Sequence, residues 1–387
     1  MEVGKSKRKI YFVDVCSLYP SVCKDGEFPV GHPKIYVGEE CEEFLGRDLD
    51  IKKVKGLIKC TVLPPTNLYF PVLLVRMHDK LLFPHCRTCC EEMRGGNCTH
   101  TQDSEREIEG SWVSLELQAA VEAGYKVTEV HGIWHYKTTK YSRVTNSGGL
   151  FAGYINSWLK IKQESSGWPP ECTDYETKMR YIAEYERFEG MKLVFEEIEK
   201  NPGKRALAKV ALCSLWGKFA QRENLTKTEV VKTQELFMEL FTSPELEITG
   251  MLPVNNDTMY VSDVHKIEAL EPSGDTNVVI ASFVTAQARL VLYNYLEPLG
   301  HRCLYFDTDS LLYYTDDETR EYVPENGDSA VTPSNLADTS QGGDEKGTED
   351  VEDCDEVFDE TADSTLEYST PGTKKKKSSW ATLTLNK

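Results

Sequence analysis

Two aspartates lie one residue apart in the segment Tyr305-Phe306-Asp307-Thr308-Asp309-Ser310. Like charges this close repel each other, so a fold that keeps them together usually supplies a cation. A hard divalent ion such as Mg²⁺ binds carboxylate oxygens and leaves room for phosphate oxygens. The segment therefore indicates either magnesium-dependent chemistry on a phosphate or a solvated turn without a bound ion.

A third aspartate, Asp14, follows the apolar run from Ile10 to Val13 and precedes Ser17, Tyr19 and Pro20. An acid at the carboxyl end of a buried strand is a typical place for a catalytic or metal-binding group. The alternative is a strand that simply ends at a polar turn residue.

Basic residues recur at helical spacing further along the chain. Asn201-Pro202-Gly203 is expected to start a helix, because proline is favourable in a first turn. Arg205, Lys209 and Cys213 then follow at intervals of four, on the same face as Trp216. Such a face suits a triphosphate and a stacked base, and the alternative is an ordinary helix with solvated cations.

Four residues between positions 86 and 100 form a potential metal site. Cys86-x2-Cys89 and Cys98-x-His100 supply the ligand types of a closed structural zinc site. The alternative is a set of spare thiols in a surface loop. The chain has 12 cysteines and no apolar leader in residues 1–9, which favours reduced thiols or metal ligands over disulfides.

The elements that position these residues are predicted from periodicity. Cys303 to Phe306 and Leu311 to Tyr314 read as a hairpin whose tip carries the acids. Strands are also expected at 52–62 and 126–136, and residues 111–125 begin as a strand and become a helix that ends at Gly124. The apolar residues of Val278 to Leu296 lie on nearly all sides, which predicts a buried helix.

Two further helices are expected between these regions. Residues 151–164 are amphipathic, and Thr173-Asp174-Tyr175-Glu176 is a capping-box pattern that opens a helix reaching about Lys200.

Length and charge set wider limits. A chain of 387 residues can form two or three lobes, and no apolar run approaches the roughly 18 residues of a membrane span. A nuclear or cytoplasmic location without membrane attachment is expected. The net charge of −19 lies mostly in residues 316–370, so it does not exclude nucleic acid as a partner of the rest. Residues 316–387 are expected to be a disordered acidic tail.

Three motifs occur in a fixed order: DVCSLYPSV from Asp14, KVALCSLWGKFA from Lys209 and YFDTDS from Tyr305. They resemble motifs A, B and C of family B DNA polymerases, in particular the protein-primed branch. The stretches CRTC…CTH, GSW…EAGY…WHY and NPGKRALAK are most similar to polymerases of Polinton/Maverick transposons and related viruses. The resemblance covers about residues 9–315.

By matching position, the resemblance implies a role for each motif residue. Asp14, Asp307 and Asp309 would be the catalytic acids, with Asp14, Asp309 and the Val15 carbonyl holding two Mg²⁺ ions. Asp307 would lie behind the metal ligands or against the substrate. The residues implied to contact the nucleotide are Val15, Ser17, Leu18, Tyr19, Arg205, Lys209 and Cys213. Among these, the Tyr19 ring would exclude a 2′-hydroxyl, and Arg205 and Lys209 would grip the triphosphate. Tyr305 and Thr308 would lie near the primer terminus.

The implied fold is α+β, with a right-hand polymerase palm and helical fingers. The palm would be one antiparallel sheet built from the Asp14 strand, the 126–136 region and the 303–314 hairpin. By residue range, the expected division is palm with motif A at 9–22, a terminal-protein-region-like insertion with the zinc loop at 23–110, palm at 111–150, fingers at 151–225, palm with motif C at 226–315, and the tail.

The chain also departs from the family pattern. Cys213 stands where motif B usually has Asn, Cys16 stands where motif A often has Asn, and Trp216 replaces Tyr. No segment for an exonuclease precedes residue 9, and no Lys-x-Tyr element or thumb follows motif C, so both domains are expected to be missing.

The expected activity is that of a DNA-directed DNA polymerase, a nucleotidyltransferase that adds dNTPs to a primer 3′-hydroxyl in replication of a mobile element or virus. Primer-template DNA, dNTPs and a terminal priming protein would be its partners. The alternatives are a non-catalytic remnant that binds nucleic acid or a partner, and a misjoined gene prediction after about residue 320.

Overall fold

The structure is a computed structural model that describes residues 9–315 except 16, 97 and 271–272. The predicted acidic tail and Cys16 therefore lie outside the described residues. The chain divides into two compact units. Among the described residues, the main unit comprises residues 9–214 and 282–315, and the small unit comprises residues 215–281. No helix in the described ranges has both the length and the apolar character to cross a membrane.

A three-stranded antiparallel sheet of the main unit carries Asp14 and Asp307 on its strands and Asp309 in its hairpin turn, and we call it the acidic sheet. Its strands are β1 (Lys9–Asp14), β12 (Ser310–Thr315) and β11 (Cys303–Asp307), in that order. β12 is the central strand, and it pairs with both neighbours. The predicted hairpin at 303–314 and the strand that ends at Asp14 are both confirmed.

One face of the acidic sheet packs on α10 (Val278–Leu299). Leu292, Leu296 and Leu299 of this helix form a core with Leu311 and Tyr313 of β12. The other face is open, because Ile10 and Phe12 of β1 are 65% and 61% exposed. The expectation that β1 is a buried strand is therefore wrong, since β1 is an edge strand that packs on one face only.

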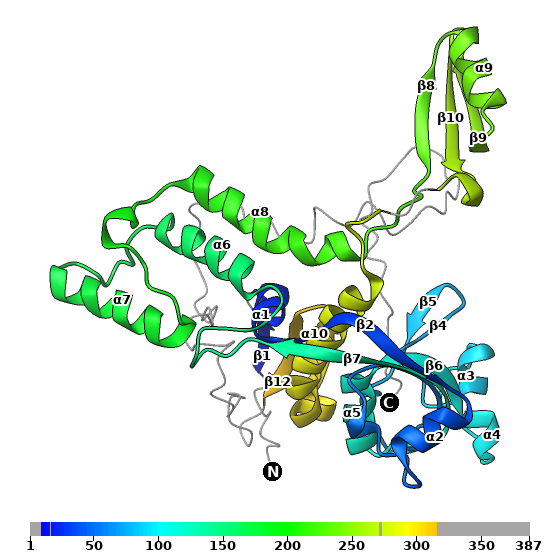
Figure 1. Ribbon diagram of the computed structural model, residues 1–387, viewed down its shortest axis with the longest axis horizontal. Helices are drawn as coiled ribbons and strands as arrows, with labels where there is room; N and C mark the ends of the chain where they lie inside the picture. The colour runs from blue at the N-terminus through cyan, green and yellow to red at the C-terminus, as the bar shows by residue number, and fades with distance from the viewer. Residues whose placement is uncertain (1–8, 16, 97, 271–272, 316–387) are drawn as a thin grey trace, which may run out of the picture. The chain divides into compact units, whose positions relative to one another are not determined.

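A four-stranded antiparallel sheet forms the second core of the main unit (Figure 1). Its strands, in spatial order, are β2 (Glu27–Val37), β7 (Lys126–Lys140), β3 (Gly56–Leu63) and β6 (Ile108–Val113). The expectation that 126–136 joins the Asp14 strand is wrong. β7 pairs with β2 on one edge and with β3 on the other, so it has no free edge for β1.

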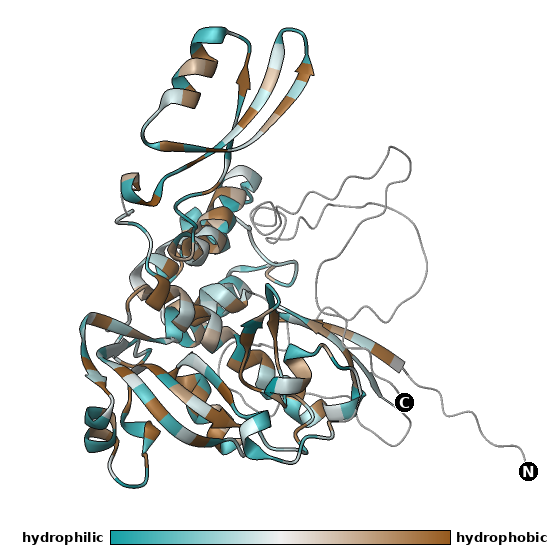
Figure 2. Ribbon diagram, turned by 90° about the vertical axis from the view of Figure 1, so that its right-hand side faces the viewer, coloured by the Kyte–Doolittle hydropathy of each residue, from teal (hydrophilic) through white to brown (hydrophobic). Residues whose placement is uncertain are grey.

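Alternation of hydrophobic and hydrophilic residues explains this sheet (Figure 2). In β3, Ile58, Cys60 and Val62 are fully buried, while Lys59 between them is exposed. α2 (Glu39–Leu45) and α5 (Ser114–Glu122) add Leu45 and Leu117 to the core. Residues 111–125 thus change from strand to helix as predicted, although the helix ends at Glu122.

α10 connects the two cores of the main unit. Leu290 and Tyr293 pack against the core of the four-stranded sheet, whereas Leu292 and Leu296 pack against the acidic sheet. A helix with partners on several sides must be apolar around most of its circumference. The prediction of a buried helix is therefore confirmed from Ala281 onward, whereas Val278 at its start is exposed.

Four helices form a further part of the main unit: α1 (Leu18–Asp25), α6 (Ala152–Glu164), α7 (Tyr175–Glu189) and α8 (Pro202–Phe219), the last of which extends into the small unit. α1 packs against α6. The Lys24 ammonium, 2% exposed, contacts the Glu189 carboxylate at 2.7 Å and so ties α1 to α7. The expected helix starts at 151 and 202 agree with α6 and α8 within one residue.

The predicted helix from 173 to about 200 is too long. Its capping box is formed by Asp174 with Thr177, one residue later than the predicted Thr173–Glu176 pattern. The helix ends at Glu189 because Gly190 adopts a left-handed conformation with φ of 72°. Glycine takes this conformation at no steric cost and commonly ends helices.

The small unit contains a sheet of its own. The strands β8 (Lys227–Val231), β10 (Thr258–His265) and β9 (Leu246–Asn255) pair in that order, and α9 (Gln234–Thr242) follows β8. These strands lie within the range 226–315 that was expected to be palm, but they do not join the acidic sheet.

The remaining elements are short. They are β4 (Val75–Met77), β5 (Lys80–Leu82), α3 (Arg87–Glu91), α4 (Asp103–Arg106) and the 3-10 helices η1 (Ile51–Lys53), η2 (Phe195–Glu197), η3 (Ile267–Ala269) and η4 (Gly300–Arg302).

Candidate active site

The register of the acidic sheet brings the acids of the first and third motifs to one end. Asp14 of β1 and Asp307 of β11 are both paired with Ser310 of β12, from opposite sides. The backbone N–H of Val15 donates a hydrogen bond of 2.8 Å to the carbonyl oxygen of Asp309. Residues 14–15 and 307–310, nearly 300 positions apart in sequence, are therefore adjacent in space.

The acids face away from α10. Residues opposite each other on paired strands point to the same face, and successive residues alternate between faces. Val13 and Leu311 pack toward the α10 core, so Asp14, Ser310 and Asp307 belong to the open face. Because neighbouring strands lie about 4.8 Å apart, the backbones of the two paired aspartates are separated by about 10 Å. A substrate can therefore approach Asp14, Ser310 and Asp307 from the solvent side of the sheet.

Neighbouring hydroxyl groups hold Asp307 in place. Its two carboxylate oxygens accept hydrogen bonds from Tyr305 Oη at 3.2 Å and from Thr308 Oγ1 at 3.1 Å. Ser310 Oγ donates to the Asp307 carbonyl at 3.3 Å. Partial burial, and then the charge of Asp307, raises the pKa of the Tyr305 phenol. The phenol thus stays a hydrogen-bond donor to this carboxylate.

The turn between β11 and β12 requires an unusual backbone conformation. It consists of Thr308 and Asp309, and Thr308 has a positive φ of 45°. Two-residue hairpins generally need a positive φ at the first turn position. The tight turn brings the Asp309 carbonyl to Val15 and keeps Asp309 next to Asp307.

The first motif forms a turn at the start of α1. The Val15 side chain is buried, and its carbonyl oxygen accepts the Leu18 N–H at 3.2 Å. Ser17 is exposed and has a left-handed φ of 58°. The Leu18 side chain is 1% exposed, so only its backbone could contact a nucleotide. Tyr19, one residue further, is half-buried.

The predicted triphosphate residues share one face of α8. This helix runs unbroken through Arg205, Lys209 and Cys213, which lie four residues apart. Arg205 is exposed, and its Nε donates to Ser166 Oγ at 3.2 Å. Lys209 and Cys213 are half-buried. α8 lies beside α6 (Figure 1), where Tyr154 Oη donates to the Ala211 carbonyl at 3.0 Å.

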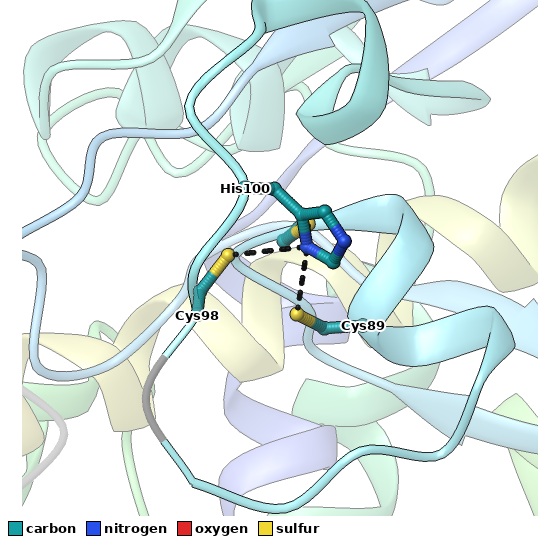
Figure 3. Close-up of side chains that lie close together, drawn as sticks. Cys89, Cys98 and His100 are labelled. Atoms are coloured by element: carbon teal, nitrogen blue, oxygen red, sulfur yellow. Dashed lines mark hydrogen bonds between the residues drawn. The ribbon is translucent and has the colours of Figure 1, made fainter.

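The donor groups of the acidic sheet fit a hard divalent cation. Three carboxylates and the Val15 carbonyl offer only oxygen ligands, as Mg²⁺ requires. Within the part of the chain that the structure describes, these carboxylates do not converge as a compact ligand group. The group of three or more potential ligands that does converge is Cys86, Cys89, Cys98 and His100. Figure 3 shows Cys89, Cys98 and His100 of this group. The four residues with predicted zinc spacing are thus brought together.

Ser310 was not among the predicted site residues. It lies between Asp14 and Asp307 in the register, with its hydroxyl on the Asp307 backbone. Its place at the end of the YFDTDS motif was the available signal.

Comparison with known proteins bears on this arrangement. Residues 1–179 match the family model of DNA polymerase type B, organellar and viral. The match includes the first motif and the four residues Cys86, Cys89, Cys98 and His100. It covers somewhat less than half of the chain. No curated protein matches.

Among solved structures, the chain resembles the orthorhombic crystal form of Phi29 DNA polymerase, with 17% identity and a TM-score of 0.45. It also resembles the ternary complex of that polymerase with primer-template DNA and incoming nucleotide substrates, with 18% identity and a TM-score of 0.45. Each alignment covers 84% of this chain and 41% of the polymerase chain. The chain thus spans less than half the length of these polymerases.

Proposed function

We propose that this chain is the core of a protein-primed family B DNA polymerase that adds dNTPs to a primer 3′-hydroxyl, as directed by a DNA template. One observation carries the proposal most strongly. The β1–β12 register pairs Asp14 of the first motif with Ser310, the residue after Asp309 of the third, and the hydrogen bond from the Val15 N–H to the Asp309 carbonyl joins the two motifs. The match of residues 1–179 to the type B polymerase family supports the same activity.

In this proposal, the metal site is the end of the acidic sheet that carries Asp14 and the turn from Asp307 to Asp309. Asp14, Asp309 and the Val15 carbonyl would hold two Mg²⁺ ions, which would supply positive charge for activating the primer hydroxyl and for stabilising the leaving pyrophosphate. Tyr305 and Thr308 orient Asp307 through their hydrogen bonds to its carboxylate. The open face of the acidic sheet, with exposed Tyr305 at its end, receives the primer terminus.

The fingers residues would bind the incoming nucleotide. Arg205 and Lys209 neutralise the triphosphate from one face of α8. Tyr19, positioned by the buried Leu18 next to it, selects against a ribose 2′-hydroxyl. The protein would act in replication of a Polinton/Maverick-type mobile element or a related virus, in the nucleus or the cytoplasm, and the motif resemblance supports this role.

Template-directed extension tests this function. With Mg²⁺, the purified chain is expected to extend a DNA primer with the templated dNTP and to discriminate against the matching ribonucleotide. A chain that is folded and binds primer-template DNA but adds no nucleotide would instead support the non-catalytic alternative, for which Cys213 in place of the motif B amide is the motivating observation.

A further inference from the structure

The Cys/His group, defined as Cys86, Cys89, Cys98 and His100, has a geometry that hydrogen bonding does not explain. The Sγ atoms of the three cysteines lie 3.5, 3.3 and 3.6 Å from the same atom, His100 Nδ1. This nitrogen carries one lone pair at most, so it can accept only one S–H hydrogen bond. Three sulfurs at nearly equal distance from one nitrogen therefore match side chains arranged around a shared centre rather than a set of hydrogen bonds.

A tetrahedral zinc ion accounts for these distances. Zinc lies about 2.3 Å from thiolate sulfur and about 2.0–2.1 Å from histidine nitrogen, so tetrahedral angles put each sulfur about 3.5–3.6 Å from the nitrogen. The observed values agree with this geometry. All four ligand atoms also lie within 4.8 Å of one another.

The local chain has few other means of holding its shape. Among the described residues from 85 to 105, Cys86 is the only buried one. Polar bonds tie α3 to α4: Thr88 Oγ1 donates to the Glu105 carbonyl at 2.8 Å, and Arg87 donates to the Ser104 carbonyl at 2.9 Å. One of these hydrogen bonds is exposed and the other is partly buried, and each adds only about 1 kcal/mol of net stability. A segment without a core of its own commonly depends on a metal.

The sequence places the ligands on two short pieces of chain. Cys86 precedes α3 and Cys89 lies within it, whereas Cys98 and His100 lie beyond a turn that contains Gly96 with φ of 98°. An ion would therefore cross-link α3 to the segment that leads into α4 and β6.

We propose that the Cys/His group binds one structural Zn²⁺ ion that holds α3 to the segment that leads into α4. The cysteines bind as thiolates and their protons pass to solvent, while His100 binds through Nδ1. Four protein ligands complete the tetrahedron, so the ion has no open position for substrate. This site is independent of the acidic sheet and of the proposed polymerase activity.

Metal content provides the first test. The full chain, purified without a metal-affinity tag, is expected to contain about one zinc per chain. Cys98→Ser should weaken zinc retention against a chelator by more than about tenfold, since even changes behind the ligands cost roughly 10- to 100-fold. Cys90→Ser is the matched control, because Cys90 is adjacent to Cys89 but lies outside the group. Equal retention by the parent and Cys98→Ser, or equal loss in both variants, would overturn the assignment.

Cobalt substitution tests the ligand set even where a variant folds poorly. Co²⁺ added to the metal-free parent chain should give the intense visible bands of a tetrahedral ion and a thiolate charge-transfer band. Weak octahedral absorption would contradict the proposal. Hydrogen exchange should then rise in residues 86–106 on chelation and stay unchanged in β3 and β7, whereas no change in 86–106 would contradict a structural role.

Discussion

Asp14 and Asp307 lie opposite the same residue, Ser310, on the two sides of the central strand of the acidic sheet. This relationship joins the beginning of the described chain to its end and leaves both carboxylates on the face that α10 does not cover. The arrangement of the two acids depends on α10, because this helix covers the other face of the acidic sheet. Contacts with both sheets of the main unit fix the position of α10.

Loss of one partner of the ion pair between Arg289 of α10 and Glu116 of α5 should strongly destabilise the main unit. Glu116 has a side-chain exposure of 4%, and Arg289 contacts its carboxylate at 2.6 Å. Arg289→Met would leave this buried charge without its partner, at a cost of about 3 kcal/mol in the free energy of unfolding. Urea denaturation measures the loss. Lys59→Met, which breaks an exposed pair with Glu109, should change stability little.

The same pair predicts a pH dependence. Burial raises the pKa of Glu116 although Arg289 opposes the shift, so the folded chain binds this proton more tightly than the unfolded chain. The stabilising effect of this proton is present below the ordinary glutamate pKa of about 4.3 and is lost as pH rises through the folded pKa. Arg289→Met removes the opposing charge and raises that pKa further. Its destabilisation should therefore grow from acidic toward neutral pH, and a pH-independent difference between variant and parent would contradict this interpretation.

Gly190 should be required at the end of α7. Its φ of 72° is unfavourable for a residue with a side chain, so Gly190→Ala should destabilise the chain by about 1 kcal/mol. Gly153 in α6 has open space around it and no positive φ, so Gly153→Ala should be neutral or stabilising by up to about 1 kcal/mol. Thermal or urea unfolding compares the two. Equal effects in both variants would show that the left-handed conformation is not what Gly190 supplies.

Lys209 should act on nucleotide binding rather than on folding. Lys209→Ala is expected to raise the KM for dNTP by about 10- to 100-fold, because a charge that contacts the triphosphate is lost. Lys204 lies about 140° around the same helix, so Lys204→Ala serves as the control. Steady-state incorporation kinetics separates the two, and an unchanged KM in Lys209→Ala would remove this residue from the site.

Cys213 offers a gain-of-function test. An asparagine amide at this position supplies hydrogen-bond donors that a thiol lacks. Cys213→Asn should therefore lower the KM for dNTP, whereas Cys213→Ser, which has no amide, should not. A lower KM in both variants, or in neither, would show that the departure from the motif does not weaken nucleotide positioning.

Local patterns in the sequence were sufficient to predict individual elements. The hairpin at Asp307–Asp309, the helix that begins at Pro202 and the apolar helix after Val278 each follow from residues close together in the chain. The spacing of Cys86, Cys89, Cys98 and His100 likewise predicted four ligands that the structure brings together.

Long-range pairing was not predictable in the same way. The strand at 126–136 was assigned to the acidic sheet, but β2 and β3 pair with its two edges. Alternation of apolar and polar residues predicts a strand, but it does not predict which strands pair with it. β1 reads as buried because Ile10 to Val13 are all apolar, yet Phe12 lies on the open face. The separate sheet of the small unit was missed for the same reason, since its strand signals do not say which strands they join.

The most direct test of the proposed function is primer extension by the parent chain, Asp14→Asn and Asp309→Asn, with Mg²⁺ and a primed DNA template. Asp257→Asn is the matched control, because Asp257 is an exposed acid at the turn between β9 and β10. We expect the parent and the control to incorporate the templated dNTP, and both active-site variants to lose at least about a thousandfold in rate while remaining folded. Incorporation by Asp309→Asn at the rate of the parent would contradict the assignment of the acidic sheet as the catalytic metal site.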